Sequence, residues 1–233
     1  FDPKEKQPDF LIINGAECEP YITSDYRCFM EEGEDVLEGV LLMLKYLGIP
    51  KCIIGIEKNK PKAIEKMTRL CEKHDNITVK ALKSSYPQGA EKTLIFSTTG
   101  RVVKEGTLPL ASGCIVVNSS TAAFIAQYIR TGMPLVKRRI TVDGNIVKKP
   151  SNFIVPVGMS IGEIVYYAEL SDKPDRIILG GPMMGACAFD PDYPLSKTNN
   201  AVLMFADSPV YEPSECIRCG KCVKACSMNL LPT

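Results

Sequence analysis

Short continuous apolar runs alternate with stretches of helical periodicity over the first 131 residues. An apolar run of four to eight residues bounded by turn residues is typical of a strand covered on both faces. Such runs predict strands at 9–14, 51–57, 77–82 and 114–118. Apolar residues at helical spacing predict helices at 34–48, 59–74, 90–100 and 121–132. This alternation predicts an α/β domain with a mostly parallel sheet and flanking helices.

Start and stop signals refine these helices. Gly48 and Gly132 follow the last periodic residues of two of them, as is typical of helix ends. Asn59 is a plausible N-cap for the helix that follows it. The stretch RCFMEEGEDV (27–36) is interpreted as a surface loop that leads into a capped helix start.

The pattern changes after Pro134. Residues 134–158 are β-rich, and Asp143-Gly144 is a hairpin signal. A helical stretch at 160–170 and a strand at 175–181 complete a small α+β module, and 190–213 is expected to be irregular apart from a strand at 201–206. We therefore expect three regions, which are an α/β domain at 1–133, the small module at 134–190, and a linker with a cysteine-rich segment at 191–233.

The overall charge excludes some functions. Lys plus Arg (28) nearly balances Asp plus Glu (27), so no global field favours binding to nucleic acid. We find no apolar run of transmembrane length, and the charged first ten residues do not resemble a signal peptide. Because the chain starts with Phe, we expect it to be a fragment, a processed product or a domain.

Ten cysteines divide into two groups. Six stand singly, mostly in apolar stretches, and are expected to be reduced, buried thiols of a cytosolic protein. The other four are Cys216, Cys219, Cys222 and Cys226, in the pattern C-x2-C-x2-C-x3-C. That spacing is typical of a ferredoxin-type [4Fe-4S] cluster, whereas structural zinc sites usually pair two distant C-x2-C knuckles.

The fourth cysteine of such a run carries a further implication. In two-cluster ferredoxins it binds the other cluster, which a second run of cysteines completes. No second run follows in this chain, so we expect it to hold the first half of a two-cluster segment. Structural zinc in a non-enzymatic binding module stays open as the alternative.

Polar residues gather after three of the predicted strands. The segment after residue 13 carries Asn14, Glu17 and Glu19, and open α/β sheets bind ligands at this edge. The other two segments are SSYPQGAEKT (84–93) and VVNSSTAA (116–123). Taken alone, each signal is weak, since a solvated turn explains the first segment better than a ligand site does and N-capping by itself explains the residue types of the third. The loop GGPMMG (180–185) lacks the spacing of a dinucleotide fingerprint and is interpreted as a tightly packed turn.

Taken together, several motifs resemble one family. They are NGAECEPYIT, GIEKNKPKAI, YPQGAEKTLI, GGPMMG and CIRCGKC, which occur in this order along nearly the whole chain. The chain resembles the C subunit of the Rnf-type ferredoxin–NAD oxidoreductase, a membrane-peripheral subunit of an ion-translocating complex. Residues 9–131 resemble, more distantly, the flavin- and NADH-binding subunit of respiratory complex I. The module after Pro134 looks like the β-grasp domain that follows in both.

The resemblance implies specific cofactor contacts. It places flavin mononucleotide (FMN) at Asn14 and Glu17, and NAD(H) at Glu19 and Glu91. It implies that Gly89 allows close approach in the same pocket. The ribityl or phosphate oxygens would be held by Asn118 and Thr121, and no residue is assigned as a catalytic acid or base.

The chain departs from the complex I pattern in two respects. Ala16 and Ala90 stand where that subunit carries acidic residues. The family's glycine-rich phosphate loop should precede residue 9 and is absent here, so we expect only half of a flavin pocket.

The resemblance implies an electron-transfer subunit that links NAD(H), FMN and [4Fe-4S] clusters, two of them in the full-length protein. Its partners would be the other subunits of a membrane-bound complex and a ferredoxin-linked redox partner, and it would lie on the cytoplasmic face of the membrane. A reductase subunit that serves a soluble partner, such as a cobalamin or amino-acid reductase, remains an alternative.

Overall fold

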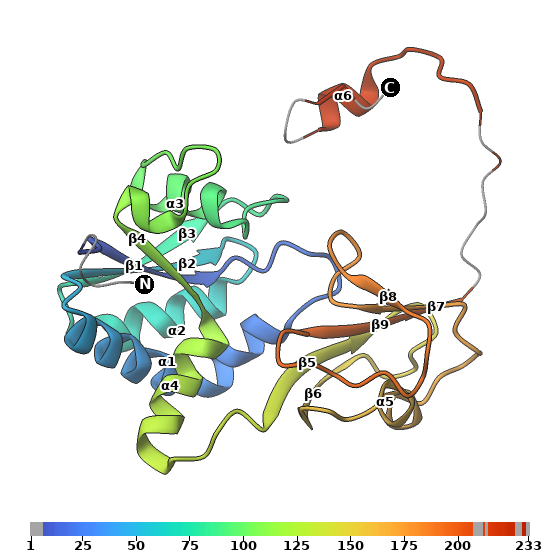
Figure 1. Ribbon diagram of the computed structural model, residues 1–233, viewed down its shortest axis with the longest axis horizontal. Coiled ribbons are helices and arrows are strands. Elements are labelled where there is room, and N and C mark those ends of the chain that lie inside the picture. The colour runs from blue at the N-terminus through green and yellow to red at the C-terminus, as the bar shows by residue number, and fades with distance from the viewer. Residues whose placement is uncertain (1–6, 207–211, 213, 227–229, 232–233) are drawn as a thin grey trace.

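The first half of the chain forms a parallel sheet, as the alternating pattern predicted. The computed structural model describes residues 7–206, 212, 214–226 and 230–231. Four strands lie in the order β3-β2-β1-β4, and every neighbouring pair is parallel (Figure 1). The strands are β1 (Phe10–Gly15), β2 (Lys51–Glu57), β3 (Ile77–Leu82) and β4 (Cys114–Asn118). Their carboxyl ends therefore meet at one edge of the sheet.

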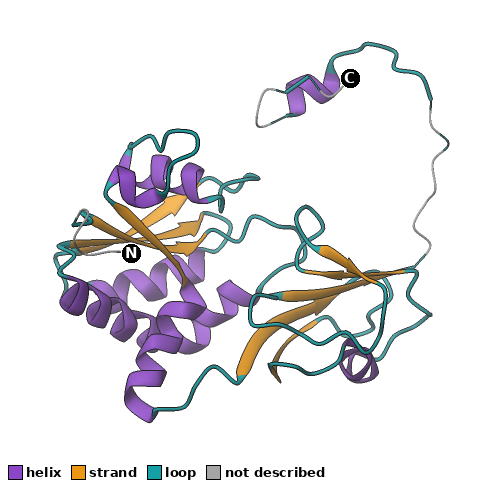
Figure 2. Ribbon diagram, viewed as in Figure 1, coloured by secondary structure: helices purple, strands orange, loops and turns teal. Residues whose placement is uncertain are grey.

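Helices cover both faces of this sheet (Figure 2). One face packs against α1 (Ser24–Leu47), α2 (Pro61–Cys71) and α4 (Ser119–Thr131). The other packs against α3 (Glu91–Thr99), with the 3-10 turn η1 (Pro109–Ser112) beside it. Strands buried on both faces need continuous apolar runs, which is the pattern in the sequence.

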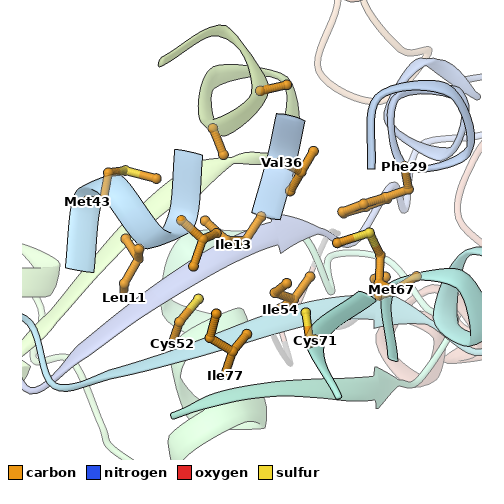
Figure 3. Close-up of a cluster of buried hydrophobic side chains, with 14 of the residues drawn as sticks. Leu11, Ile13, Phe29, Val36, Met43, Cys52, Ile54, Met67, Cys71 and Ile77 are labelled. Atoms are coloured by element: carbon orange, nitrogen blue, oxygen red, sulfur yellow. The ribbon is translucent and has the colours of Figure 1, made fainter. Parts of the chain in front are cut away.

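Successive side chains of a strand point to opposite faces of the sheet, so those of β1 are divided between the two helix layers. Leu11 and Ile13 point toward α1 and α2, whereas Ile12 packs with the α3 layer. Figure 3 shows the first layer, where Ile54 of β2 and Val36 of α1 pack in the same hydrophobic core. All five side chains are fully buried, and burial of each contributes about 1.5–3 kcal/mol to the free energy of folding.

Helix α1 begins ten residues before the predicted start, so the interpretation of residues 27–36 as a surface loop is wrong. Cys28 and Phe29 are buried against the sheet, and their burial stabilises helix in a stretch whose acidic residues and Gly33 suggested a loop. The helix is kinked at Glu32, where the backbone is non-helical (φ −120°, ψ 25°). Farther along, Gly39 lets α4 approach closely, because a Cβ there would lie 1.9 Å from the carbonyl oxygen of Ala122.

The other helix boundaries partly confirm the predictions. Asn59 does not cap α2, because Lys60 is the N-cap residue and Pro61 occupies the first turn. That helix ends at Cys71, three residues before the predicted end. Asn118 does cap α4, and its side chain accepts a hydrogen bond from the backbone N–H of Ser120.

A second, mixed sheet follows the linker after α4. Five strands lie in the order β6-β5-β9-β7-β8. They are β5 (Lys137–Asp143), β6 (Ser151–Pro156), β7 (Arg176–Leu179), β8 (Ala186–Ala188) and β9 (Ala201–Phe205). The predicted hairpin is confirmed, since β5 and β6 pair antiparallel. One helix, α5 (Ile161–Ala168), packs on this sheet and begins with a capping box between Ser160 and Glu163.

The two sheets meet through the first turns of α1. The backbone N–H of Thr23 donates to Oγ1 of Thr141 on β5 at 3.0 Å, and the side chain of Asn152 donates to Thr23 at 2.8 Å. Arg139 of β5 forms ion pairs with Glu31 (2.5 Å) and Glu32 (2.6 Å), beside the kink of α1. These contacts join the segment after β1 to the second sheet.

A last short helix, α6 (Lys221–Ala225), lies within the cysteine run. Within the described ranges, no helix is both long enough and apolar enough to cross a membrane.

Candidate functional site

A pocket of about 440 Å³ opens where the carboxyl ends of β1, β2 and β3 meet the second sheet. This is the sheet edge at which open α/β folds bind ligands. Its walls come from the loops that follow the three strands and from the end of β5. The lining residues are Glu17, Cys18, Glu19, Pro20, Tyr21, Ile22, Thr23, Glu57, Asn59, Lys60, Ser84, Ser85, Tyr86 and Asp143.

Glu17, predicted from the sequence, is buried and holds the start of α1. Its Oε1 accepts hydrogen bonds from the backbone N–H of Asp25 (2.8 Å) and the hydroxyl of Ser24 (3.4 Å). The ammonium of Lys60 lies 3.7 Å from Oε2. Burial, followed by the nearby Asp25 carboxylate, raises the pKa of Glu17 to about 8. Glu17, in the loop before α1, thus accepts a hydrogen bond from a backbone N–H group in the first turn, which has no partner within the helix.

Asn118, also predicted, is connected to the same helix start. Its amide donates to both carboxylate oxygens of Asp25 at 3.2 and 3.1 Å, and Ser119 donates to one of them at 3.0 Å. Burial raises the pKa of Asp25, and the bonds from Asn118 and Ser119 oppose that shift. The amide of Asn118 is therefore engaged with Asp25, and its carbonyl oxygen caps α4.

Glu19 lines the pocket and contacts a loop of the second sheet directly. Its Oε2 accepts a hydrogen bond of 2.8 Å from the backbone N–H of Met183 in the GGPMMG loop. Gly181 packs directly on this carboxylate, since a Cβ there would lie 2.3 Å from the same oxygen. The predicted tight packing of that loop is confirmed, and its partner is Glu19.

Asn14 and Gly89 join the loops after β1 and β3. The amide of Asn14 donates to the carbonyl oxygen of Gly89 at 2.9 Å, and its own oxygen accepts from the N–H of Ala16. A Cβ on Gly89 would lie 2.4 Å from the carbonyl oxygen of Ala16, so the approach requires glycine. The N–H of Gly89 also donates to Sγ of Cys18, and burial raises the pKa of that thiol.

Glu57 and Lys60 are site residues that the sequence analysis did not single out. Glu57 ends β2 with 1% of its surface exposed, and its Oε2 has no hydrogen-bond partner among the described residues. Burial raises the pKa of Glu57, and the Lys60 charge opposes that rise. The signal available in the sequence was a lone carboxylate at the end of the apolar run KCIIGIE.

Of the seven predicted residues, Glu17 and Glu19 alone are among the described residues that line the pocket. Asn14, Gly89 and Asn118 lie beside it, in the contacts given above. Glu91 is the exposed first residue of α3, and Thr121 is exposed in the first turn of α4. Both lie near strand ends in the sequence, but their side chains are on the surface.

The scattered cysteines partly confirm the prediction of buried thiols. Four of them are buried, namely Cys28, Cys52, Cys71 and Cys114. Cys18 is half-buried, and Cys187 is exposed on the edge strand β8, so burial was wrong for Cys187. None of the cysteines in the described residues forms a disulfide.

The four clustered cysteines lie in and beside α6. Cys216, Cys219 and Cys222 are exposed and Cys226 is half-buried. Backbone N–H groups donate to two sulfurs, from Arg218 to Cys216 (3.3 Å) and from Leu230 to Cys226 (3.4 Å). In the part of the chain that the structure describes, no three Cys, His, Asp or Glu side chains converge closely enough to hold a metal ion. The thiol set and its N–H···S bonds suit an iron–sulfur core, but the sulfurs are not gathered around one point.

The electrostatics of the pocket restrict its ligands. Four acidic side chains and one lysine are among the described residues that line it, and the raised pKa of one of them, Glu17, favours its uncharged form. Such a lining repels a phosphate and accepts hydrogen bonds from uncharged hydroxyl or amide groups. The pocket volume lies within the usual range for small-molecule sites. The residues present therefore fit the uncharged part of a nucleotide, whereas its phosphate needs positive groups from elsewhere.

A parallel sheet with helices on both faces and a polar pocket at its carboxyl edge defines an α/β domain of the nucleotide-binding type. The family model of the Nuo51 FMN-binding domain matches residues 1–127. The chain belongs to this family.

Curated relatives share nearly the whole chain. It is 41% identical over 234 residues to the C subunit of a proton-translocating ferredoxin:NAD(+) oxidoreductase complex from Clostridium ljungdahlii, covering 99% of this chain and 51% of the relative. It is 39% identical over 233 residues to the C subunit of the Na(+)-translocating complex of Acetobacterium woodii, covering 99% and 53%. The chain thus spans about half the length of these relatives.

A solved structure shares the fold. An NAD+-reducing [NiFe]-hydrogenase in the H2-reduced state superposes with a TM-score of 0.71 at 20% identity, over 88% of this chain and 41% of that chain. At this identity the likeness shows the fold alone.

Proposed function

We propose that this chain is the cofactor-binding part of a C subunit of an ion-translocating ferredoxin–NAD oxidoreductase. It passes electrons between NAD(H), FMN and [4Fe-4S] clusters, two of them in the full-length protein. The observation that carries the proposal is the identity of about 40% along 99% of the chain, which includes both the pocket segments and the cysteine run. Membership of the Nuo51 FMN-binding domain family supports FMN as one cofactor.

The pocket residues support a division of roles. Asn14 and Gly89 join the loops after β1 and β3 beside the pocket, and Glu17, which lines it, holds the start of α1. We assign the nicotinamide nucleotide to the side of Glu19, whose carboxylate lies in the pocket. Asn118, Thr121 and Glu91 would contact cofactor atoms that extend beyond the described pocket.

FMN accepts a hydride as two electrons and releases them singly to one-electron carriers. The protein's task is to bind and orient the nucleotides at the sheet edge. The carboxylates limit the affinity for an anionic nucleotide through charge repulsion, which favours release of product.

The cysteine run supports iron–sulfur clusters as the acceptors of electrons from the flavin. Cys216, Cys219 and Cys222 would hold one cluster, and Cys226 would bind the next, completed by a second run of cysteines. We propose that region 1–133 acts as the flavin domain and region 134–190 as the β-grasp module, completed by strand β9 between β5 and β7, and that the rest of 191–233 begins the cluster segment. We also propose that the protein lies on the cytoplasmic membrane face, bound to the other subunits of its complex and linked to ferredoxin.

An anaerobic cofactor assay on the full-length protein tests the proposal. FMN, iron and zinc are quantified, NADH is added, and the visible spectrum is followed. We expect FMN and iron together, with both absorptions bleached by NADH. Zinc alone, or iron without flavin and without a response to NADH, would refute the hydride step.

A further inference from the structure

The carboxyl group of Glu57, which lines the pocket, is buried without a full set of hydrogen bonds. Its side chain ends the central strand β2 and is 1% exposed, yet Oε2 has no hydrogen-bond partner among the described residues. Buried polar groups are nearly always paired, because an unpaired one loses its bonds to water without replacement. A group that the fold leaves unpaired needs an explanation.

The neighbouring residues do not complete its bonding. The backbone of Ser85 interacts favourably with the ionised carboxyl group, but that leaves Oε2 without a bond. The ammonium of Lys60 is directed to Glu17, at 3.7 Å, and lies over the ring of Tyr26, 5.7 Å from its centre. Lys60 therefore stabilises the negative charge at a distance without bonding to Glu57.

The pocket limits what can complete the bonding. Glu57 shares the lining with the carboxylates of Glu19 and Asp143, so a phosphate or carboxylate would be repelled. A metal ion does not fit either, because no three candidate ligands converge in the described ranges. An uncharged N–H or O–H group remains, since it can donate a hydrogen bond without adding negative charge.

We propose that Glu57 is a ligand-binding residue whose Oε2, enclosed in the ligand-free protein, turns toward the pocket and accepts a hydrogen bond from an uncharged hydroxyl or amide group of the bound nucleotide. This inference rests on the proposed function, because it takes FMN or NAD(H) as the ligand. This hydrogen bond orients the nucleotide, because its hydroxyl- or amide-bearing part lies beside Glu57 and its phosphate is directed away from the carboxylates of Glu19 and Asp143.

This role makes opposite predictions for stability and for binding. Without ligand, Glu57 carries a buried oxygen that no described residue pairs, so Glu57→Leu should raise the melting temperature of the ligand-free protein. With ligand, the same substitution removes an acceptor, and the affinity should fall about tenfold for the nucleotide that contacts it. Glu57→Gln retains one oxygen acceptor and should lose less affinity than Glu57→Leu.

The experiment compares these variants in the full-length protein. Melting temperatures are measured after removal of flavin, and dissociation constants for FMN and for NADH are measured by calorimetry. Glu65→Leu is the matched control, because Glu65 is exposed on α2, outside the pocket lining. The control should change neither dissociation constant.

The outcomes separate this inference from the proposed function. A lower melting temperature for ligand-free Glu57→Leu would show that the carboxyl stabilises the fold, and would overturn the inference. Unchanged affinity for both nucleotides would overturn it as well, while the proposed function would stand. If the wild-type protein binds neither FMN nor NADH, the proposed function fails and the inference fails with it.

Discussion

At the scale of single residues, the pocket edge depends on carboxylates with different partners. Glu17 is buried among backbone N–H groups, Glu19 bonds to the GGPMMG loop, and Glu57 keeps one oxygen unpaired among the described residues. All three end or follow strands of the same sheet, yet their surroundings give them different chemistry. Residue type alone does not decide whether a carboxylate supports the fold or faces a ligand.

Glu17 makes stability depend on pH. Its pKa is raised from 4.5 to about 8 in the folded chain, so the folded state binds this proton more tightly than the unfolded state. The stabilisation is complete below pH 4.5 and is lost as the pH rises through about 8. We expect Glu17→Gln to reduce this loss of stability, which is on the order of a few kcal/mol at most.

Urea denaturation at pH 5, 7 and 9 measures the effect. Because glutamine stays uncharged, the variant should match the wild-type protein at the lowest pH and exceed it at the highest. A wild-type free energy of unfolding that rises across this range, or a variant with the same slope, would contradict the assignment.

At the scale of elements, helix α1 connects the two sheets. Its first turns receive Glu17 from the loop after β1, and its kink lies beside Arg139 of β5. The side chain of Arg139 is 9% exposed and its Nε is unpaired among the described residues. Removing the side chain takes the cation from Glu32 and leaves Glu31 with Arg27. The ion pairs of Arg139 thus connect the kink of α1 to β5.

We expect Arg139→Met to lower the free energy of unfolding by about 1–3 kcal/mol, less than for a fully buried pair because both glutamates are partly exposed. Arg130→Met is the matched control, because Arg130 pairs with Asp35 and Glu38 on the surface and should change stability little. Chemical denaturation of both variants measures the difference. Equal losses in the free energy of unfolding would show that the ion pairs of Arg139 stabilise the protein no more than surface ion pairs do.

At the scale of the whole molecule, the pocket and the cysteine run lie in different parts of the chain. The pocket is formed by three strand ends of the first sheet and the end of β5 in the second. The cysteines lie beyond residue 214, in and beside α6, with exposed or half-buried sulfurs. Flavin binding and iron binding should therefore respond to separate substitutions.

We expect Cys219→Ser in the full-length protein to lower the iron content and to leave the FMN content unchanged, because a serine hydroxyl is a poor ligand for iron beside three thiolates. Cys187→Ser is the matched control, since Cys187 is also exposed but lies on β8. Iron and flavin analysis of the purified proteins measures both. Normal iron in Cys219→Ser, or equal losses in the two variants, would contradict the cluster assignment.

The sequence by itself determined the layered α/β order of the first half, the hairpin of the second sheet and the cysteine spacing. Each depends on local periodicity or on residues close together in the chain, such as the buried runs that became β1 and β2. It also indicated the sheet edge of the site, because parallel strands end on the same side.

Only the tertiary structure decided which side chains meet at that edge. Asn14 and Gly89 are 75 residues apart, and Glu19 and Met183 are 164 apart, so no local pattern predicts their hydrogen bonds. The start of α1 was missed because burial of Cys28 and Phe29 outweighs the polar residues around Gly33. Glu57 was missed because a carboxylate at a strand end becomes distinctive only when the surrounding loops bury it and the described residues leave one of its oxygens unpaired.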